Sequence, residues 1–258
     1  MSIELPPSDR ELLEGVIDLH VHAMPCIFDR PFDEVALARQ ARDAGYRAIL
    51  FKCHHAINAD RAYLIRRIVP GIEVFGGIVL NHPVGGINPE AVDAAIGFGA
   101  KEVWMPALHA MNHIEVVGMP SYPRHVRVRD AGEPRRGVRG ITILTDEGEL
   151  IPQVHEILGL IADADIILGT SHLSLEEVTI LIGAARAAGV KKVLVTHPGW
   201  EATAWSVEEQ AEMAEKGAFL EHCFSPCMPY GARYDPRLIA EAIRRVGAHR
   251  CVMATDVG

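Results

Sequence analysis

The sequence lacks a long hydrophobic run. Among its 258 residues, no apolar stretch approaches the roughly 18 residues that a membrane-spanning helix needs. The first residues, MSIELPPSDRELLEG, are polar and acidic and do not have the pattern of a secretory signal peptide. We therefore expect no membrane partner and a cytoplasmic location.

Positive charge is also scarce. The chain has 25 Lys and Arg against 34 Asp and Glu, a formal net charge of −9, which disfavours binding to nucleic acid. A small-molecule substrate is the expected partner, and association into a homo-oligomer is left open. The 5 cysteines form no CxxC pair, so we expect free thiols in a reducing compartment.

Short apolar segments alternate with helical patterns along the whole chain. Strands are predicted at residues 16–22, 47–53, 73–80, 101–106, 166–170, 192–196, 218–222 and 250–255. Eight repeats of strand, loop and helix predict an α/β fold, a (β/α)8 TIM barrel that forms a single domain over residues 1–258. An open doubly wound sheet is the alternative, but no GxGxxG or GxxxxGK motif follows any predicted strand.

Capping signals mark the helices between these strands. SLEEVTILIGAARAAG begins with a Ser174/Glu177 capping box and ends at Gly189, and FDEVALARQARDAG ends at Gly45. NPEAVDAAIGFG and DPRLIAEAIRRVG each place a proline directly after an Asn or Asp cap. These segments are predicted to be the helices that cover the barrel.

Two regions depart from the repeat. After the fourth predicted strand, residues 107–151 read as an irregular insertion that closes in a short hairpin and lies over the barrel mouth. It contains six arginines, interpreted either as a clamp for a substrate anion or as a solvated loop: Arg124, Arg127, Arg129, Arg135, Arg136 and Arg139. At the other departure the chain stops at Gly258, directly after the eighth strand, so we expect a short barrel or a truncated sequence.

Metal-ligand residue types occur at the ends of the predicted strands. His20 and His22 lie on one face of the first strand, because side chains alternate along a strand. His172, His197 and Asp256 each follow a later buried-type strand. Since imidazole and carboxylate suit zinc, iron, manganese or nickel, the pattern predicts one metal site built from many strands.

The motifs DLHVH, GTSH, VTHPG and ATDVG, in this order, resemble those of the amidohydrolase superfamily of metal-dependent hydrolases. The resemblance spans nearly the whole chain and implies a (β/α)8 barrel whose divalent metal, zinc first, activates a water molecule. It also implies that His20, His22 and Asp256 bind one ion. His172 and His197 would then bind a second ion or the substrate oxygen.

One ligand of that family's pattern is absent. Binuclear members carry a carboxylated lysine or a glutamate after strand four, whereas here MPALHAMNH follows, and Lys101 and Glu102 lie at the wrong end of that strand. Lys52 and His54, after the second strand, are candidates to bridge ions or bind substrate; a lysine with a packed stem is the simpler reading of Lys52. Either one or two ions are therefore expected.

The remaining candidates concern the substrate and the reaction. Glu221, at the end of the seventh strand, is predicted to contact substrate or to pair with a neighbouring cation. His109 and His113 either line the mouth or belong to the insertion without a function, and the second reading is favoured. A bound cation lowers the pKa of water to about 7, and Asp256 is predicted to take its proton while His197 or His172 holds the developing oxyanion.

The predicted function is metal-dependent hydrolysis of a small amide, lactone or ester. The same pattern also fits a metal-dependent decarboxylase or other lyase, and a metal-binding protein that does not catalyse a reaction.

Overall fold

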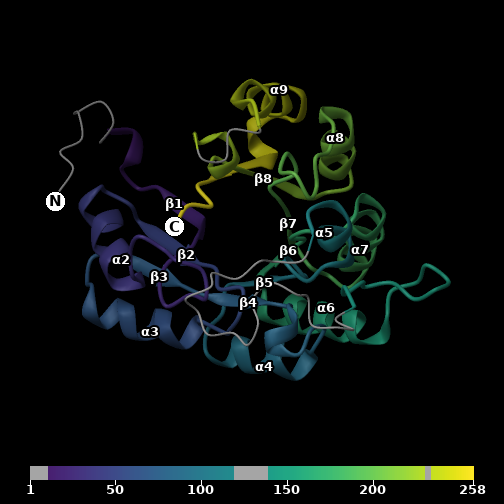
Figure 1. The fold of residues 1–258 in the computed structure, drawn as a ribbon, viewed down its shortest axis with the longest axis horizontal. Coiled ribbons are helices and arrows are strands. Elements are labelled where there is room, and N and C mark those ends of the chain that lie inside the picture. Colours follow the sequence, from purple (N-terminus) through teal and green to yellow (C-terminus); the bar gives the residue numbers. More distant parts are fainter. Residues whose placement is uncertain (1–10, 119–138, 230–233) are drawn as a thin grey trace.

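The computed structural model describes residues 11–118, 139–229 and 234–258. It has the predicted (β/α)8 fold, with parallel strands in the middle and helices around the outside (Figure 1). The strands are β1 (Ile17–Val21), β2 (Ala48–Phe51), β3 (Glu73–Phe75), β4 (Gly77–Val79), β5 (Glu102–Trp104), β6 (Ile167–Gly169), β7 (Lys192–Thr196), β8 (Phe219–Cys223) and β9 (Cys251–Ala254). The α-helices are α2 (Glu34–Asp43), α3 (Ala59–Ile68), α4 (Pro89–Gly97), α5 (Met111–Val116), α6 (Pro152–Ala164), α7 (Leu175–Ala187), α8 (Val207–Glu215) and α9 (Pro236–Val246).

The third predicted strand, residues 73–80, is two strands in the structure. β3 pairs with β2, and β4 pairs with β5, so the chain changes partner at Gly76. Asn58 contacts the chain at this point, where its Oδ1 accepts a hydrogen bond of 2.8 Å from the Gly77 N–H. A Cβ on Gly76 would lie only 2.6 Å from the Asn58 carbonyl oxygen, so a residue without a side chain is needed where this loop crosses the strand.

Backbone hydrogen bonds join the end of β1 to the residues that follow β9. The Asp256 N–H donates to the His20 carbonyl oxygen and the His22 N–H donates to the Val257 carbonyl oxygen, each at 2.8 Å. The chain end therefore lies beside β1 (Figure 1). These hydrogen bonds bring the carboxyl ends of β1 and β9 together, although more than 200 residues separate them in sequence.

The predicted helix signals are confirmed. Ser174 and Glu177 form the capping box of α7, and α4 and α9 each have proline in the first turn after an Asn88 or Asp235 cap. Apolar residues of these helices and of the strands pack into one large buried cluster between the two layers. None of the described helices is long and apolar enough to cross a membrane.

The insertion is more regular than predicted, because it contains helix α5. The Asn112 side-chain amide donates to the His172 carbonyl oxygen at 3.0 Å and to the Ala202 carbonyl oxygen at 2.7 Å, which ties this helix to the ends of later strands. The predicted hairpin reduces to an isolated antiparallel bridge between Leu144 and Leu150. Residues 119–138, with all of the arginine cluster except Arg139, lie outside the described residues.

Candidate metal centre

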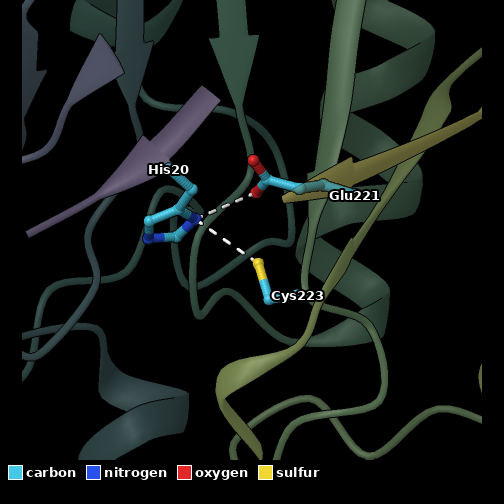
Figure 2. A group of neighbouring side chains, drawn as sticks. All are labelled: His20, Glu221 and Cys223. Carbon is cyan, nitrogen blue, oxygen red and sulfur yellow. Dashed lines mark hydrogen bonds and ion pairs between the residues drawn. The ribbon is translucent and has the colours of Figure 1, made fainter. Parts of the chain in front are cut away.

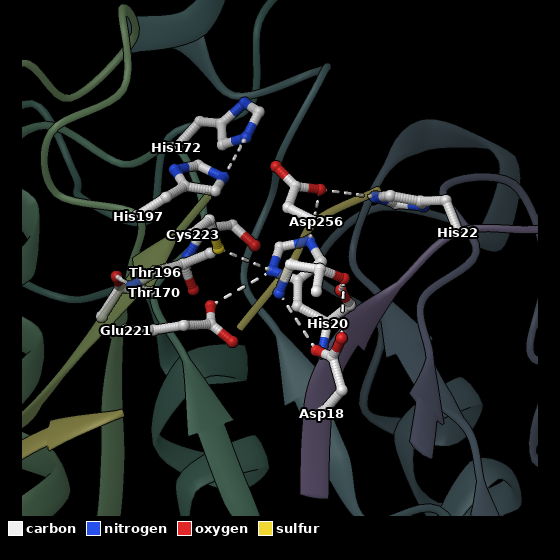
Figure 3. Close-up of polar contacts among 12 residues, drawn as sticks. Asp18, His20, His22, Thr170, His172, Thr196, His197, Glu221, Cys223 and Asp256 are labelled. Carbon is white, nitrogen blue, oxygen red and sulfur yellow. Dashed lines mark hydrogen bonds and ion pairs between the residues drawn. The ribbon is translucent and has the colours of Figure 1, made fainter. Parts of the chain in front are cut away.

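Three predicted ligands converge at the mouth of the barrel. The Nε2 atoms of His20 and His22 each lie 3.1 Å from Oδ1 of Asp256 (Figure 3). Both histidines are buried, at 0% and 5% exposure, whereas the Asp256 side chain keeps 18%. The structure thus brings together donors from both ends of the chain, with one side open to the mouth.

These distances fit a shared divalent ion. Two ligands placed about 2.05 Å from a tetrahedral zinc ion lie about 3.3 Å from each other. The buried Nε2 of His20 has no hydrogen-bond partner, although it lies 3.1 Å from Asp256 Oδ1. A separation of 3.1 Å fits an ion pair between the imidazole and the carboxylate, and it also fits two ligands of one cation.

Asp18, which the sequence analysis did not single out, holds this group in place. Its Oδ1 accepts a hydrogen bond from the His20 N–H at 3.1 Å, and its Oδ2 accepts one from the Thr255 hydroxyl at 2.6 Å. Thr255 directly precedes Asp256, whose φ of 52° lies in the left-handed region that residues other than glycine rarely adopt. Asp18 therefore stabilises a strained strand end that directs the Asp256 carboxylate toward the histidines.

Glu221 lies behind His20. Its Oε2 is 3.2 Å from Nδ1 of His20, and the Cys223 sulfur is 3.6 Å from the same nitrogen (Figure 2). The glutamate is fully buried, and it contacts Nδ1 of His20 while Asp256 contacts Nε2, a position that fits pairing with a neighbouring cation, the second of its two predicted roles. A carboxylate at Nδ1 orients the imidazole and leaves Nε2 free for a metal.

His20, Glu221 and Cys223 also form a group with ligand atoms within 4.8 Å of one another. When an ion replaces the proton on one nitrogen of His20, the ring keeps its proton on the other nitrogen, so His20 serves as a ligand on one side at a time. Burial, then Glu221, raises the pKa of the Cys223 thiol well above its ordinary value, which disfavours the thiolate that metals bind. The Asp256 side is therefore the better ion site.

The charges of this half are strongly coupled. Burial lowers the pKa of His20, but Asp256 and Glu221 outweigh it and raise the pKa to about 9. Burial raises the pKa of Asp256, and the two histidines reverse this and hold it well below its ordinary value. Burial lowers the pKa of His22 to about 4. Asp256 is thus an ionised carboxylate, available as an anionic ligand.

The second predicted pair also meets. Nε2 of His172 lies 3.2 Å from Nε2 of His197 (Figure 3), again the separation of two ligands around one ion. The His197 ring lies 5.7 Å from the His20 ring between centroids, so this pair faces the first group. Burial lowers the pKa of His197 to about 3 and that of His172 well below its ordinary value, so both imidazoles are neutral.

Two residues complete the surroundings of this pair. Nδ1 of His113, in α5, lies 2.8 Å from Nδ1 of His172, and the Trp200 ring stacks on His113 with 5.6 Å between centroids. The favoured expectation for His113 was a loop residue without function, although it lies in the MPALHAMNH segment where the family's missing ligand is expected. No local periodicity indicates that a histidine of an insertion reaches His172.

Lys52 and His54 lie next to both groups of ligands. Lys52 is 3% exposed, and burial lowers the pKa of its ammonium, an effect that Asp256 and Glu221 oppose. It also interacts electrostatically with His172 and His197. The His54 ring stacks on His22 with 4.8 Å between centroids. Both side chains therefore lie beside the candidate ligands, and their role remains a prediction.

Comparisons with known proteins agree with this fold. An amidohydrolase from Pseudomonas aeruginosa superposes with a TM-score of 0.61 at 17% identity, covering 98% of this chain and 77% of that one. A probable dipeptidase from the same organism gives 0.56 at 9% identity, covering 96% and 86%. An organophosphorus hydrolase from Deinococcus radiodurans gives 0.55 at 9% identity, covering 93% and 74%. The chain thus has an amidohydrolase-like (β/α)8 barrel fold.

Residues 15–221 match the model of a family of unknown function, DUF6282, and the chain belongs to that family. No curated protein matches the chain. Because the structural neighbours share less than a fifth of its residues, they define the fold, and the reaction has to be argued from the site itself.

Proposed function

We propose that this protein is a metal-dependent hydrolase that uses water to cleave a small amide, lactone or ester. The observation that supports the proposal best is the approach of His20 Nε2 and His22 Nε2 to one oxygen of Asp256, at 3.1 Å each. A divalent ion held by these residues would polarise the substrate carbonyl and lower the pKa of a bound water to about 7.

The residues of the chain supply the other parts of the reaction. Both histidine contacts of Asp256 use Oδ1, so Oδ2 is the oxygen proposed to take the proton of the attacking water and pass it to the leaving group. His172 and His197, neutral and facing this group across the mouth, are proposed to hold a second ion or the oxygen on which negative charge develops.

Zinc is the first candidate because the donors are imidazole nitrogens and a carboxylate, and manganese, iron and nickel share this preference. Lys52 and His54 are proposed to bridge two ions or to bind substrate. The buried Lys52 interacts electrostatically with the ligands of both groups, which supports this role.

Metal analysis of purified protein tests the ion site. His20→Asn and His22→Asn are expected to lower bound metal per chain, whereas His155→Asn, which changes an exposed histidine on α6, is the matched control. Unchanged metal in both site variants would refute the assignment.

A screen of amide, lactone and ester substrates then tests the reaction. Turnover that follows metal content across these variants supports a hydrolase. Metal-loaded protein that releases carbon dioxide from carboxylic acid substrates would indicate a lyase instead, and metal-loaded protein without turnover on either class would indicate a binding protein.

A further inference from the structure

Helix α5 places a third histidine behind the His172 and His197 pair. His113 is 3% exposed, and its ring stacks on the His172 ring with 4.8 Å between centroids and 24° between planes. Its Nδ1 lies 2.8 Å from Nδ1 of His172, which is a hydrogen-bond distance between two ring nitrogens. The three imidazoles thus form a row from the mouth of the barrel into the insertion.

The number of protons in this row limits how it can be arranged. Both nitrogens of His172 face another imidazole, Nδ1 toward His113 and Nε2 toward His197. A neutral imidazole carries one N–H, so His172 donates on one side and accepts on the other. If Nε2 of His172 binds an ion, the ring proton of His172 must be on Nδ1. His113 must then accept a hydrogen bond from this N–H through an unprotonated Nδ1.

We propose that His113 is a positioning residue that holds His172 in the tautomer and ring orientation needed to bind a divalent ion together with His197. This inference rests on the proposed function, because it assigns a partner to the second half of that site. Metal-ligating histidines usually donate their other ring N–H to such a partner. Here the partner is an imidazole that a helix of the insertion supplies.

Other contacts keep His113 in this position. The side chain of Asn112, its neighbour in α5, donates to the His172 carbonyl oxygen at 3.0 Å. The Trp200 ring lies nearly parallel to His113, at 16°, and is 4.7 Å from the His172 ring between centroids. The insertion therefore contributes to the geometry of the ion site.

Stepwise titration of the metal-free, full-length protein with Zn²⁺ tests this role, with Co²⁺ absorption as a spectroscopic readout of the ligand geometry. His113→Leu is expected to lower the affinity for the second ion about 10- to 100-fold and to leave the affinity for the first ion unchanged. His113→Asn, whose amide oxygen can accept near the position of Nδ1, should recover part of that affinity.

His109→Leu is the matched control. This histidine lies in the same insertion, is buried at 6% exposure and meets His82 edge to face, at 70° between ring planes. The His109→Leu variant should bind both ions with the same affinities as the unchanged protein. Circular dichroism and retention of the first ion show that each variant is folded.

The outcomes separate the two proposals. A His113→Leu protein that binds the second ion with unchanged affinity and an unchanged Co²⁺ spectrum would overturn the role of His113 alone. Uptake of a single ion by the unchanged protein would also overturn it. An unchanged protein that takes up no ion at all would overturn the proposed function as well.

Discussion

The two halves of the candidate centre differ in charge. The His20, His22 and Asp256 half contains an ionised carboxylate, with a second carboxylate, Glu221, behind His20. The His172 and His197 half consists of neutral imidazoles whose next neighbours, His113 and Trp200, are neutral as well.

This difference has a consequence for metal binding. An anionic ligand attracts a divalent cation more strongly in a buried site than a neutral imidazole does, because the low dielectric strengthens the interaction. The first half supplies three ligand atoms by itself, whereas the second supplies only two from the predicted residues and needs a further donor. We therefore expect the first ion to bind more tightly than the second.

The largest expected effect comes from removing the carboxylate. Asp256→Asn keeps the shape of the side chain but loses its charge and its ability to take a proton, so hydrolysis should fall about 10²- to 10⁴-fold. The measurement is kcat on a substrate found in the screen, with circular dichroism to show an intact fold. Full activity in this variant would show that Asp256 does not transfer the proton. It would also show that the carboxylate gives the first half no larger part in catalysis than the second half.

Removal of a ligand from the neutral half should have a smaller effect. His197→Asn is expected to abolish binding of the second ion and to lower kcat about 10²- to 10³-fold, with the first ion retained. Elemental analysis after dialysis measures the ions per chain. Loss of both ions together would contradict the division into two halves and indicate one joint site.

Substitution of the residue behind His20 tests the first half without changing a ligand. Glu221→Gln should lower the affinity for the first ion about 10-fold, because a neutral amide polarises the His20 N–H less than a carboxylate does. Glu177→Gln is the matched control, since this buried glutamate caps α7 and bonds to Thr142, away from the centre. Equal metal affinities in both variants would show that Glu221 does not support His20.

The smallest expected effect is the change in thermal stability when the metal is removed. If the free ion stands at about 100 times its Kd, binding stabilises the folded state by about 2.7 kcal/mol, which corresponds to a shift in Tm of about 5 to 10 °C. A chelator should lower Tm of the unchanged protein by this amount and have little effect on Asp256→Asn. If chelator changes the Tm of neither protein, binding of the ion does not stabilise the folded state.

The element order and the helix ends were predictable because they depend on local patterns. The capping box at Ser174 and Glu177, and the prolines after Asn88 and Asp235, act within a few residues of where they occur. The change of strand partner at Gly76 was not predictable, because Asn58, which contacts the chain at this point, comes from another loop. Helix α5 was missed because part of its support comes from hydrogen bonds between Asn112 and distant carbonyl groups.

The candidate ligands were predictable in kind and in strand position, and their partners were not. Alternation along β1 places His20 and His22 on one face, and both rings reach Asp256. Two of these partners come from distant parts of the sequence: Glu221 contacts His20, and His113 contacts His172. Strand period determines which face a side chain occupies, but it does not determine the neighbour that it meets across a barrel.

By itself, the sequence determined which residues can act as ligands and that each lies at or near the end of a strand, because apolar runs and short-range alternation encode both. Only the tertiary structure decided the contacts themselves: backbone hydrogen bonds hold the residues after β9 against β1, and Nε2 of His20 and of His22 each lie 3.1 Å from Oδ1 of Asp256. It also decided which nitrogen of each imidazole faces the site and which is held by a neighbour. These features depend on how the two ends of the chain meet and on packing between distant segments, whose geometry no local pattern specifies.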